Sequence, residues 1–155
     1  MNTDTIAARE QDIVEEFSMF DDWMGKYEYL IELGKDLPLI EAAYKTEAHR
    51  IRGCQAQVWL RAAFREGKVH YTADSDAFIT KGLISLLVRV LSNQPPADIA
   101  EARLGFLDQI GLKEHLSATR KNGLGAMVEQ MKRYAVAFQS TVNGQPSSVS
   151  FSDDR

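Results

Sequence analysis

The sequence contains a single cysteine, Cys54, among its 155 residues. One thiol cannot form an internal disulfide, which excludes a disulfide-stabilised fold and indicates a reducing, cytoplasmic setting. The chain also lacks an apolar run long enough to span a bilayer. Its acidic N-terminus, MNTDTIAAREQDIVEEF, lacks the apolar stretch of a secretory signal. We therefore predict a cytoplasmic protein with no membrane partner.

An excess of positive charge is missing as well. The formal net charge is -4, so the broad basic surface that nucleic-acid binding requires is not expected. Metal-ligand spacing is also missing, because Cys54 and the histidines His49, His70 and His115 form no paired motif. The segment TRKNGLGAM has two glycines but not the spacing of a phosphate-binding loop. We predict no nucleic-acid partner, no metal and no cofactor.

What the chain does contain is enough apolar material for one core. It is 45% hydrophobic and 26% charged, a balance typical of globular domains of this length. We predict a single domain over residues 1–140. Residues 141–155 are mostly Ser, Gly, Asn and Asp with little periodicity, and we expect a flexible C-terminal tail there.

The hydrophobic period changes twice along the chain. Apolar residues fall at helical spacing up to Gly34, and Asp21 or Asp22 could cap the second helix. From residue 56 the period becomes two, and the residues expected on the buried face are Ala56, Val58, Leu60, Ala62 and Phe64, then Val69, Tyr71 and Ala73. The REGK segment between these runs predicts a hairpin turn. Arg50–Arg52 is expected to form a short edge strand.

After the hairpin the helical period returns. Ser75 is the expected N-cap of the next helix, with Asp76 in its first turn, and Ser117 is the expected cap of the last helix. The fold class predicted from these patterns is α+β, with a small antiparallel sheet of about three strands flanked by helices.

The thiol of Cys54 is the first candidate for chemistry. Gly53 suggests a backbone bend before it, and a strand follows Gln55, so the sulfur is expected at a loop tip beside a rigid element. Arg50 and Arg52 could favour the reactive thiolate, or they could equally form a solvated face. The alternative is a small buried cysteine that is chemically inert. His49 or His70 acting as a base would make the protein a cysteine-dependent hydrolase or acyltransferase instead.

Four other residues, Asp74, Asp76, Trp59 and Arg120, each have two possible roles. Asp74 and Asp76 are either a carboxylate pair for acid–base work or a helix-capping feature. Trp59 is either an exposed partner contact or is covered by helices on both faces of the sheet. Arg120 could meet an anion or a partner, or could be an ordinary surface arginine.

Four stretches, taken in order, resemble the SufE family of sulfur acceptors in iron–sulfur cluster assembly. They are DDWMGKYEYLIELGKDLP, HRIRGCQAQVWL, ADSDAFITKGLISLLVRVLSNQPP and IGLKEHLSATRKNGLGAM, within residues 17–134. The cysteine stretch is the most specific of the four. Many members have serine where this chain has Ala56, which puts any hydroxyl contact from that position in doubt.

The resemblance implies a SufE/IscU-like fold and a function. Cys54 would accept sulfane sulfur as a persulfide from a cysteine desulfurase (SufS/CsdA-like), stimulate that enzyme, and pass the sulfur to a SufBCD-like scaffold. Gly53 and Gln55 would let the loop move outward, Arg120 would steer the partner or the persulfide anion, and Asp74 would lie close to the loop. The protein would then be a carrier rather than a stand-alone enzyme. A non-catalytic interaction module is the remaining alternative.

Overall fold

The structure, a computed structural model, describes residues 4–142 of the chain. The elements before the cysteine are α1 (Ile6–Phe17), α2 (Trp23–Gly34) and the 3-10 turns η1 (Ala42–Tyr44) and η2 (Glu47–His49). The elements after it are β1 (Val58–Arg65), β2 (Lys68–Ser75), α3 (Phe78–Leu91), α4 (Pro96–Glu101), α5 (Phe106–Gln109), α6 (Leu112–His115) and α7 (Ala118–Val142). Within this described part, no helix is both long and apolar enough to cross a membrane.

The two strands form an antiparallel hairpin that is paired from Val58↔Ser75 to Arg65↔Lys68. Its turn places Glu66 and Gly67 at φ 55° and 78°, the left-handed pair of a type I′ turn, which matches the twist of the strands. The predicted alternation is confirmed at Val58, Leu60, Val69, Tyr71 and Ala73, which are buried. Ala62 and Phe64 on the same face are only half-buried, and Ala56 precedes the strand.

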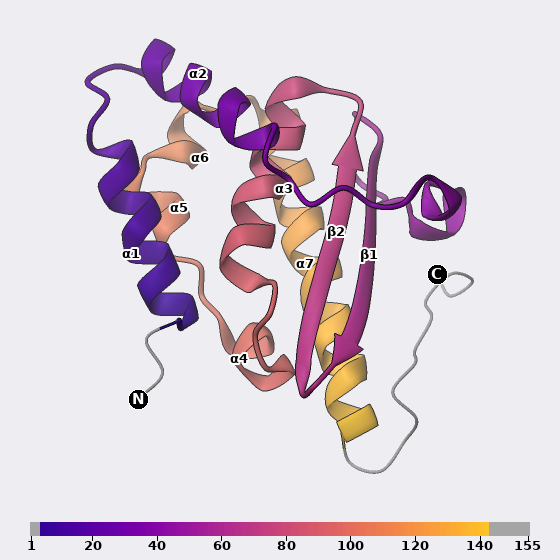
Figure 1. Ribbon diagram of the computed structural model, residues 1–155. Helices are drawn as coiled ribbons and strands as arrows, with labels where there is room; N and C mark the ends of the chain where they lie inside the picture. Colours follow the sequence, from indigo (N-terminus) through magenta and orange to yellow (C-terminus); the bar gives the residue numbers. More distant parts are fainter. Residues whose placement is uncertain (1–3, 143–155) are drawn as a thin grey trace.

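The helices cover one face of the hairpin (Figure 1). Helix α3 packs on β2 and α7 on β1, while α1 lies on the far side of α3. The Tyr71 hydroxyl donates a hydrogen bond of 2.7 Å to the carbonyl of Met131, which joins β2 to α7 inside the core. The predicted α+β class is confirmed.

Helices α2 and α3 touch backbone to backbone. A Cβ placed on Gly82 would lie 2.4 Å from the Leu30 carbonyl oxygen, and one placed on Gly34 would lie 3.1 Å from the Gly82 nitrogen. Leu30 is fully buried at this crossing. The two glycines therefore set how closely the N-terminal helices approach the helix that backs the hairpin.

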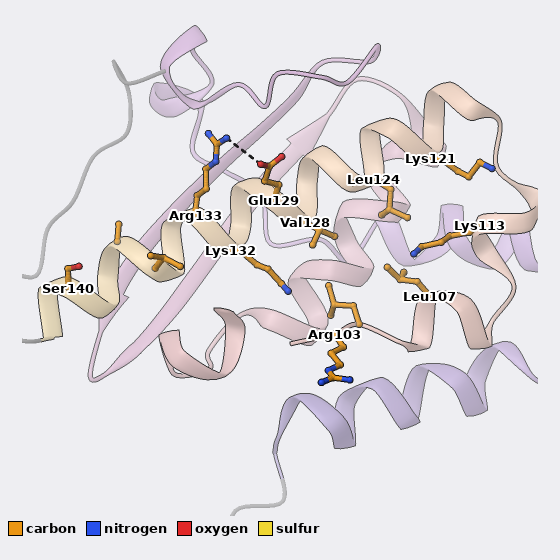
Figure 2. A pocket seen from close by; sticks show the side chains of 14 residues that line it. Arg103, Leu107, Lys113, Lys121, Leu124, Val128, Glu129, Lys132, Arg133 and Ser140 are labelled. Atoms are coloured by element: carbon orange, nitrogen blue, oxygen red, sulfur yellow. Dashed lines mark hydrogen bonds and ion pairs between the residues drawn. The ribbon is translucent and has the colours of Figure 1, made fainter. Parts of the chain in front are cut away.

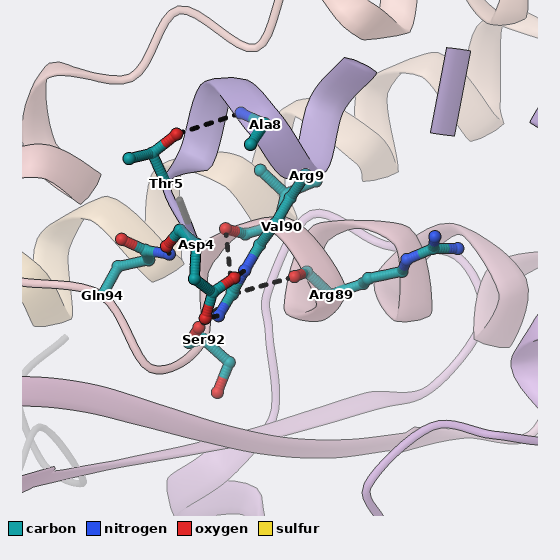
Figure 3. A network of polar contacts seen from close by, with 8 residues as sticks. All are labelled: Asp4, Thr5, Ala8, Arg9, Arg89, Val90, Ser92 and Gln94. Atoms are coloured by element: carbon teal, nitrogen blue, oxygen red, sulfur yellow. Dashed lines mark hydrogen bonds and ion pairs between the residues drawn. The ribbon is translucent and has the colours of Figure 1, made fainter. Parts of the chain in front are cut away.

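The first helix is fastened to the end of α3 by one arginine (Figure 3). Arg9 Nη1 donates to the carbonyls of Arg89 (3.0 Å) and Ser92, while its Nε and Nη2 contact Asp4 at 2.7 and 2.8 Å. The side chain thus satisfies carbonyls that the last turn of a helix leaves without partners.

The predicted edge strand at Arg50–Arg52 is replaced by a single isolated bridge, Arg50↔Trp59, and the sheet has two strands within the described residues. The Ile51 N–H still donates to the Val58 carbonyl (2.8 Å). The chain then turns at Gly53, whose φ is 93°, so no extended run can continue.

The prediction that Ser75 caps α3 is wrong. Ser75 is the last residue of β2, and the pairing continues beyond it because Asp76 and Gln57 exchange hydrogen bonds of 3.2 and 3.0 Å. Helix α3 therefore starts only at Phe78, and Asp76 lies before its first turn. The other two cap predictions are confirmed: Asp22 accepts from the Gly25 N–H (2.9 Å) and Ser117 from the Arg120 N–H (3.2 Å).

The outer face of the hairpin carries Trp59, which is half-buried. Neither alternative for it holds, because the segment that carries the short 3-10 turn η1, rather than an α-helix, lies against this face. Lys45 Nζ is 4.8 Å from the Trp59 ring centroid, and Arg61 is 4.1 Å from the Tyr44 ring.

Helix α7 extends to Val142. The first two residues of the predicted tail, Thr141 and Val142, are therefore helical, and residues 143–155 lie outside the described part of the chain.

Candidate functional site

Cys54 lies in the loop between η2 and β1, and its side chain is half-buried. The Ile51–Val58 hydrogen bond closes the base of this loop, and the bend at Gly53 directs the next residue toward the helices. The prediction of a thiol in a loop beside a strand is confirmed by this geometry.

The loop rests on the first half of α7 at two small residues. The Cys54 thiol donates a long hydrogen bond of 3.5 Å to the carbonyl of Gly123, and a Cβ placed on Gly123 would lie 3.4 Å from the sulfur. A Cβ placed on Gly53 would lie 3.2 Å from the Cβ of Ala126. Sequence reasoning missed Gly123 and Ala126, although glycines inside a helical stripe are a signal of close backbone approach.

A pocket of about 400 Å³ opens beside the sulfur. Its lining includes three of the predicted site residues. Cys54 and Gln55 come from the cysteine loop, and Arg120 comes from the start of α7. The pocket is completed by Ala56, Asp76, Ala77, Thr80, Leu83, Thr119 and Met127. The site therefore has a nucleophile, a cationic rim and room for a small group.

Burial raises the pKa of the Cys54 thiol, and the charge of Arg50 opposes this shift only in part. Arg50 therefore favours the thiolate, as the sequence suggested it could, but desolvation penalises the charged form more than Arg50 helps it. Arg50 is also engaged by Glu47 at 3.0 Å, and Arg52 is 73% exposed with its nearest carboxylate oxygen at 4.0 Å.

This electrostatic arrangement predicts the pH dependence of alkylation. Only the thiolate reacts, so the rate of Cys54 alkylation by iodoacetamide should rise with pH and reach its midpoint above that of a free cysteine. Arg50→Gln should raise the pKa further and slow the reaction at neutral pH by roughly two- to threefold, as expected for a partly screened charge. Arg52→Gln is the matched control and should leave the profile unchanged. A wild-type midpoint at or below that of a free cysteine would contradict the prediction.

Asp74 lies on β2, where Lys45 and Lys81 contact its carboxylate at 3.0 and 3.3 Å. Burial alone would raise the pKa of Asp74, but Lys45, the Ser75 N–H and Lys81 together outweigh it and lower that pKa. Asp74 does not line the Cys54 pocket, whereas Asp76 does.

The two carboxylates are therefore not a proton-sharing pair. Asp74 forms ion pairs with Lys45 and Lys81. Asp76 instead accepts a hydrogen bond from the Gln57 backbone N–H. The role of Asp76 in shaping the pocket was not anticipated from the sequence.

No histidine lines the Cys54 pocket among the described residues. His49 packs edge-on against Tyr44 and lines a neighbouring hollow with Arg50 and Arg52. His70 sits in the middle of β2 opposite Ala63, and His115 stacks on Trp23 with centroids 4.1 Å apart. A cysteine hydrolase needs a base within hydrogen-bonding reach of its nucleophile, and this site does not supply a histidine for that role.

Comparison with protein families and curated proteins gives consistent matches. The family model described as SufE, Fe-S metabolism associated domain, matches residues 11–135. SufE-like protein 1, chloroplastic/mitochondrial, of Arabidopsis thaliana is 39% identical over 141 residues, which cover 90% of this chain and 38% of that protein. The chain therefore spans well under half the length of this relative.

Bacterial relatives match over most of their length. An uncharacterized SufE-like protein of Synechocystis is 38% identical over 82% of this chain and 80% of its own. The sulfur acceptor protein CsdE of Escherichia coli is 37% identical over 73% of this chain and 78% of its own.

A solved structure shares the fold. The solution structure of a hypothetical protein from Thermus thermophilus aligns with a TM-score of 0.71 at 22% identity, covering 85% of this chain and 96% of that one.

Proposed function

Because this chain belongs to the SufE family, we propose that it accepts sulfane sulfur from a cysteine desulfurase as a persulfide on Cys54. The proposed carrier stimulates the desulfurase by removing its product, and it delivers the sulfur to an iron–sulfur scaffold of the SufBCD type. The cytoplasm is the proposed compartment, because reductants there keep a lone thiol free. The sulfur is cargo, and the protein needs no cofactor for this transfer.

The transfer is a thiol–persulfide exchange. The Cys54 thiolate attacks the outer sulfur of the donor persulfide, a new sulfur–sulfur bond forms, the donor bond breaks, and the donor cysteine leaves as a thiolate. No net oxidation or reduction occurs. A second nearby thiol would attack the new persulfide and release the sulfur, so a chain with one cysteine retains its cargo.

The observation that carries this proposal is the half-buried lone thiol opening into a pocket rimmed by Arg120. A persulfide is an anion at neutral pH, and a cationic side chain at the rim favours it. Partial shelter of the sulfur limits oxidation. The raised pKa of the resting thiol fits a site that becomes reactive when a partner draws the loop outward, a movement that Gly53 and exposed Gln55 would permit.

An intact-mass measurement tests the proposal. The protein is incubated with a cysteine desulfurase and cysteine, and the expected result is a gain of one sulfur atom that dithiothreitol removes. Omitting cysteine is the control. Absence of the added sulfur under conditions where the desulfurase turns over would leave the non-catalytic interaction module as the better description.

Arg120 gives a second test of the proposal. Its side chain is exposed at the pocket rim, so Arg120→Ala should leave the fold intact. Loss of one charged contact should raise the concentration needed for half-maximal stimulation of the desulfurase by about three- to tenfold.

The matched control for this test is Arg65→Ala, an exposed arginine at the hairpin turn. Equal stimulation curves for the two variants would remove Arg120 from the proposed partner contact.

A further inference from the structure

One buried hydroxyl group lacks a partner. Among the described residues, the polar side chains that are buried are Ser75, Thr80, Ser85 and Gln94. Ser75 accepts from a backbone N–H at 3.3 Å, and Ser85 and Gln94 each donate to a backbone carbonyl at 2.9 Å. The hydroxyl of Thr80 has no hydrogen bond within the described part of the chain, although the residue is only 8% exposed. Because buried hydroxyls are nearly always hydrogen-bonded in native proteins, this one is available to a group that enters its surroundings.

Thr80 lies on the wall of the Cys54 pocket. It stands in the first turn of α3, three residues before Leu83, and both residues line the pocket from the same face of the helix. Arg120 and Met127 line it from α7. Cys54 reaches it from the loop, so the free hydroxyl and the sulfur face the same space of about 400 Å³.

The larger groove along α7, of about 880 Å³, shares no lining residue with this pocket (Figure 2). Its cations are mostly used by the fold itself. Arg133 contacts Glu129 at 3.4 Å, Lys113 contacts Asp108 at 3.6 Å, and Lys132 donates to a backbone carbonyl. Three of the five cations that line the groove are therefore already engaged, and the buried donor without a partner lies in the smaller pocket beside the sulfur.

A persulfide changes what this pocket must hold. The sulfur–sulfur bond is about 2.05 Å long, so the outer sulfur extends beyond Cys54 Sγ by the length of one bond. The Gly123 carbonyl, which accepts from the resting thiol, is itself an acceptor and cannot stabilise a sulfur anion. An anion needs hydrogen-bond donors, and a threonine hydroxyl is one.

We propose that Thr80 donates a hydrogen bond to the outer sulfur of the persulfide that Cys54 carries. This role rests on the proposed function, because that function places a second sulfur atom in the pocket. Thr80 is then a binding residue for the cargo, and it holds the outer sulfur in its anionic form until the sulfur is passed on. No covalent bond forms or breaks in this step. The cargo also supplies the partner that the Thr80 hydroxyl otherwise lacks.

Three charged groups act on the same sulfur. Arg120 and Asp76 line the pocket, and the charge of Arg50 acts on Cys54 from the base of the loop. Substitution of Thr80 leaves all three in place. A change in the ionisation of the persulfide therefore reports the loss of the hydroxyl.

The persulfide can be loaded without a desulfurase. The protein is treated with inorganic polysulfide, from which the Cys54 thiolate takes one sulfur atom while a polysulfide shorter by one sulfur leaves. The excess is removed, and alkylation of the persulfide by iodoacetamide is followed by intact mass at a series of pH values, because the anion is the nucleophile. The midpoint of this profile measures the ionisation of the persulfide.

Thr80→Val removes the hydroxyl at nearly constant volume. Loss of one hydrogen bond to the charged form should lower the acid dissociation constant of the persulfide by about three- to tenfold, which moves the midpoint upward by about half to one pH unit. Thr80→Ser retains a hydroxyl and should keep most of the wild-type behaviour. Thr80→Val should not lower Tm, because the hydroxyl that it removes has no partner in the protein.

Ser85→Ala is the matched control. It removes a buried hydroxyl from the same helix, but this hydroxyl donates to the Leu33 carbonyl and does not line the Cys54 pocket. The variant should lower Tm and leave the midpoint of persulfide alkylation unchanged.

Equal midpoints for wild type and Thr80→Val would overturn the proposal. Equal shifts in Thr80→Val and Thr80→Ser would do the same, because the effect would then come from packing. A fall in Tm for Thr80→Val as large as that for Ser85→Ala would show that the hydroxyl has a structural partner. A protein that is loaded by polysulfide but not by a desulfurase with cysteine would instead contradict the proposed function, and the pH profile would still report on Thr80.

Discussion

Cys54→Ser should reduce stimulation of a cysteine desulfurase to the level of the desulfurase alone. A serine oxygen cannot carry a persulfide, and its hydroxyl is scarcely ionised at neutral pH, whereas even an unperturbed thiol is a few per cent thiolate. The substitution changes little volume at a half-buried position with one weak hydrogen bond. The free energy of unfolding should therefore change by less than about 1 kcal/mol.

The measurement is sulfide release by the desulfurase under reductant, with wild type and variant at equal concentration. A binding assay is the control, because the variant should still dock on the desulfurase through an intact surface. Stimulation by Cys54→Ser equal to wild type would show that the sulfur-relay proposal is wrong. If the variant lost both binding to the desulfurase and stimulation of it, Cys54 would instead be assigned to the docking surface.

Among the glycines that the structure describes, Gly82 should be the one whose replacement by alanine destabilises the protein most. The added Cβ would lie 2.4 Å from the Leu30 carbonyl oxygen and 2.8 Å from Leu30 Cγ, and neither a backbone carbonyl nor a fully buried leucine can move aside without separating α2 from α3. Overpacking of this kind costs about 1–3 kcal/mol, and we expect the upper end. For a domain of this size that lowers Tm by roughly 6–12 °C.

Gly125→Ala is the matched control for this prediction. It is also a helical glycine, but a Cβ there would meet nothing within 4 Å. Replacing it should raise stability by about 0.5–1 kcal/mol through helix propensity alone. Both variants are measured by thermal and urea unfolding. Similar Tm values for the two alanine variants would contradict the close helix crossing.

Much of the fold was predictable because it depends on local patterns. The period-two run fixed the buried face of the hairpin at Val58, Leu60, Val69, Tyr71 and Ala73, since side chains alternate across a strand. Asp22 and Ser117 were recognisable caps because a short polar side chain satisfies free N–H groups one turn ahead.

The two wrong local predictions, at Ser75 and at Arg50–Arg52, had different causes. Ser75 by itself resembles a helix cap, but it pairs with Val58 in the hairpin. The next residue, Asp76, continues the pairing through hydrogen bonds with Gln57. Arg50–Arg52 resembles an edge strand, but the turn at Gly53 leaves one bridge. Pairing with a residue distant in sequence decided the outcome for Ser75, whereas a local backbone turn decided it for Arg50–Arg52.

By itself, the sequence determined the α+β class, the buried face of the hairpin and the presence of one thiol in a loop before a strand. Only the tertiary structure decided the environment of that thiol. The sulfur lies against Gly123, 69 residues away, and shares its pocket with Arg120 and Asp76. Desolvation depends on this packing, so the sign of the pKa shift of Cys54 could not follow from the neighbouring arginines. Burial by distant residues outweighs the charge of Arg50 because a nearby cation stays partly screened by water while the sulfur loses part of its own hydration.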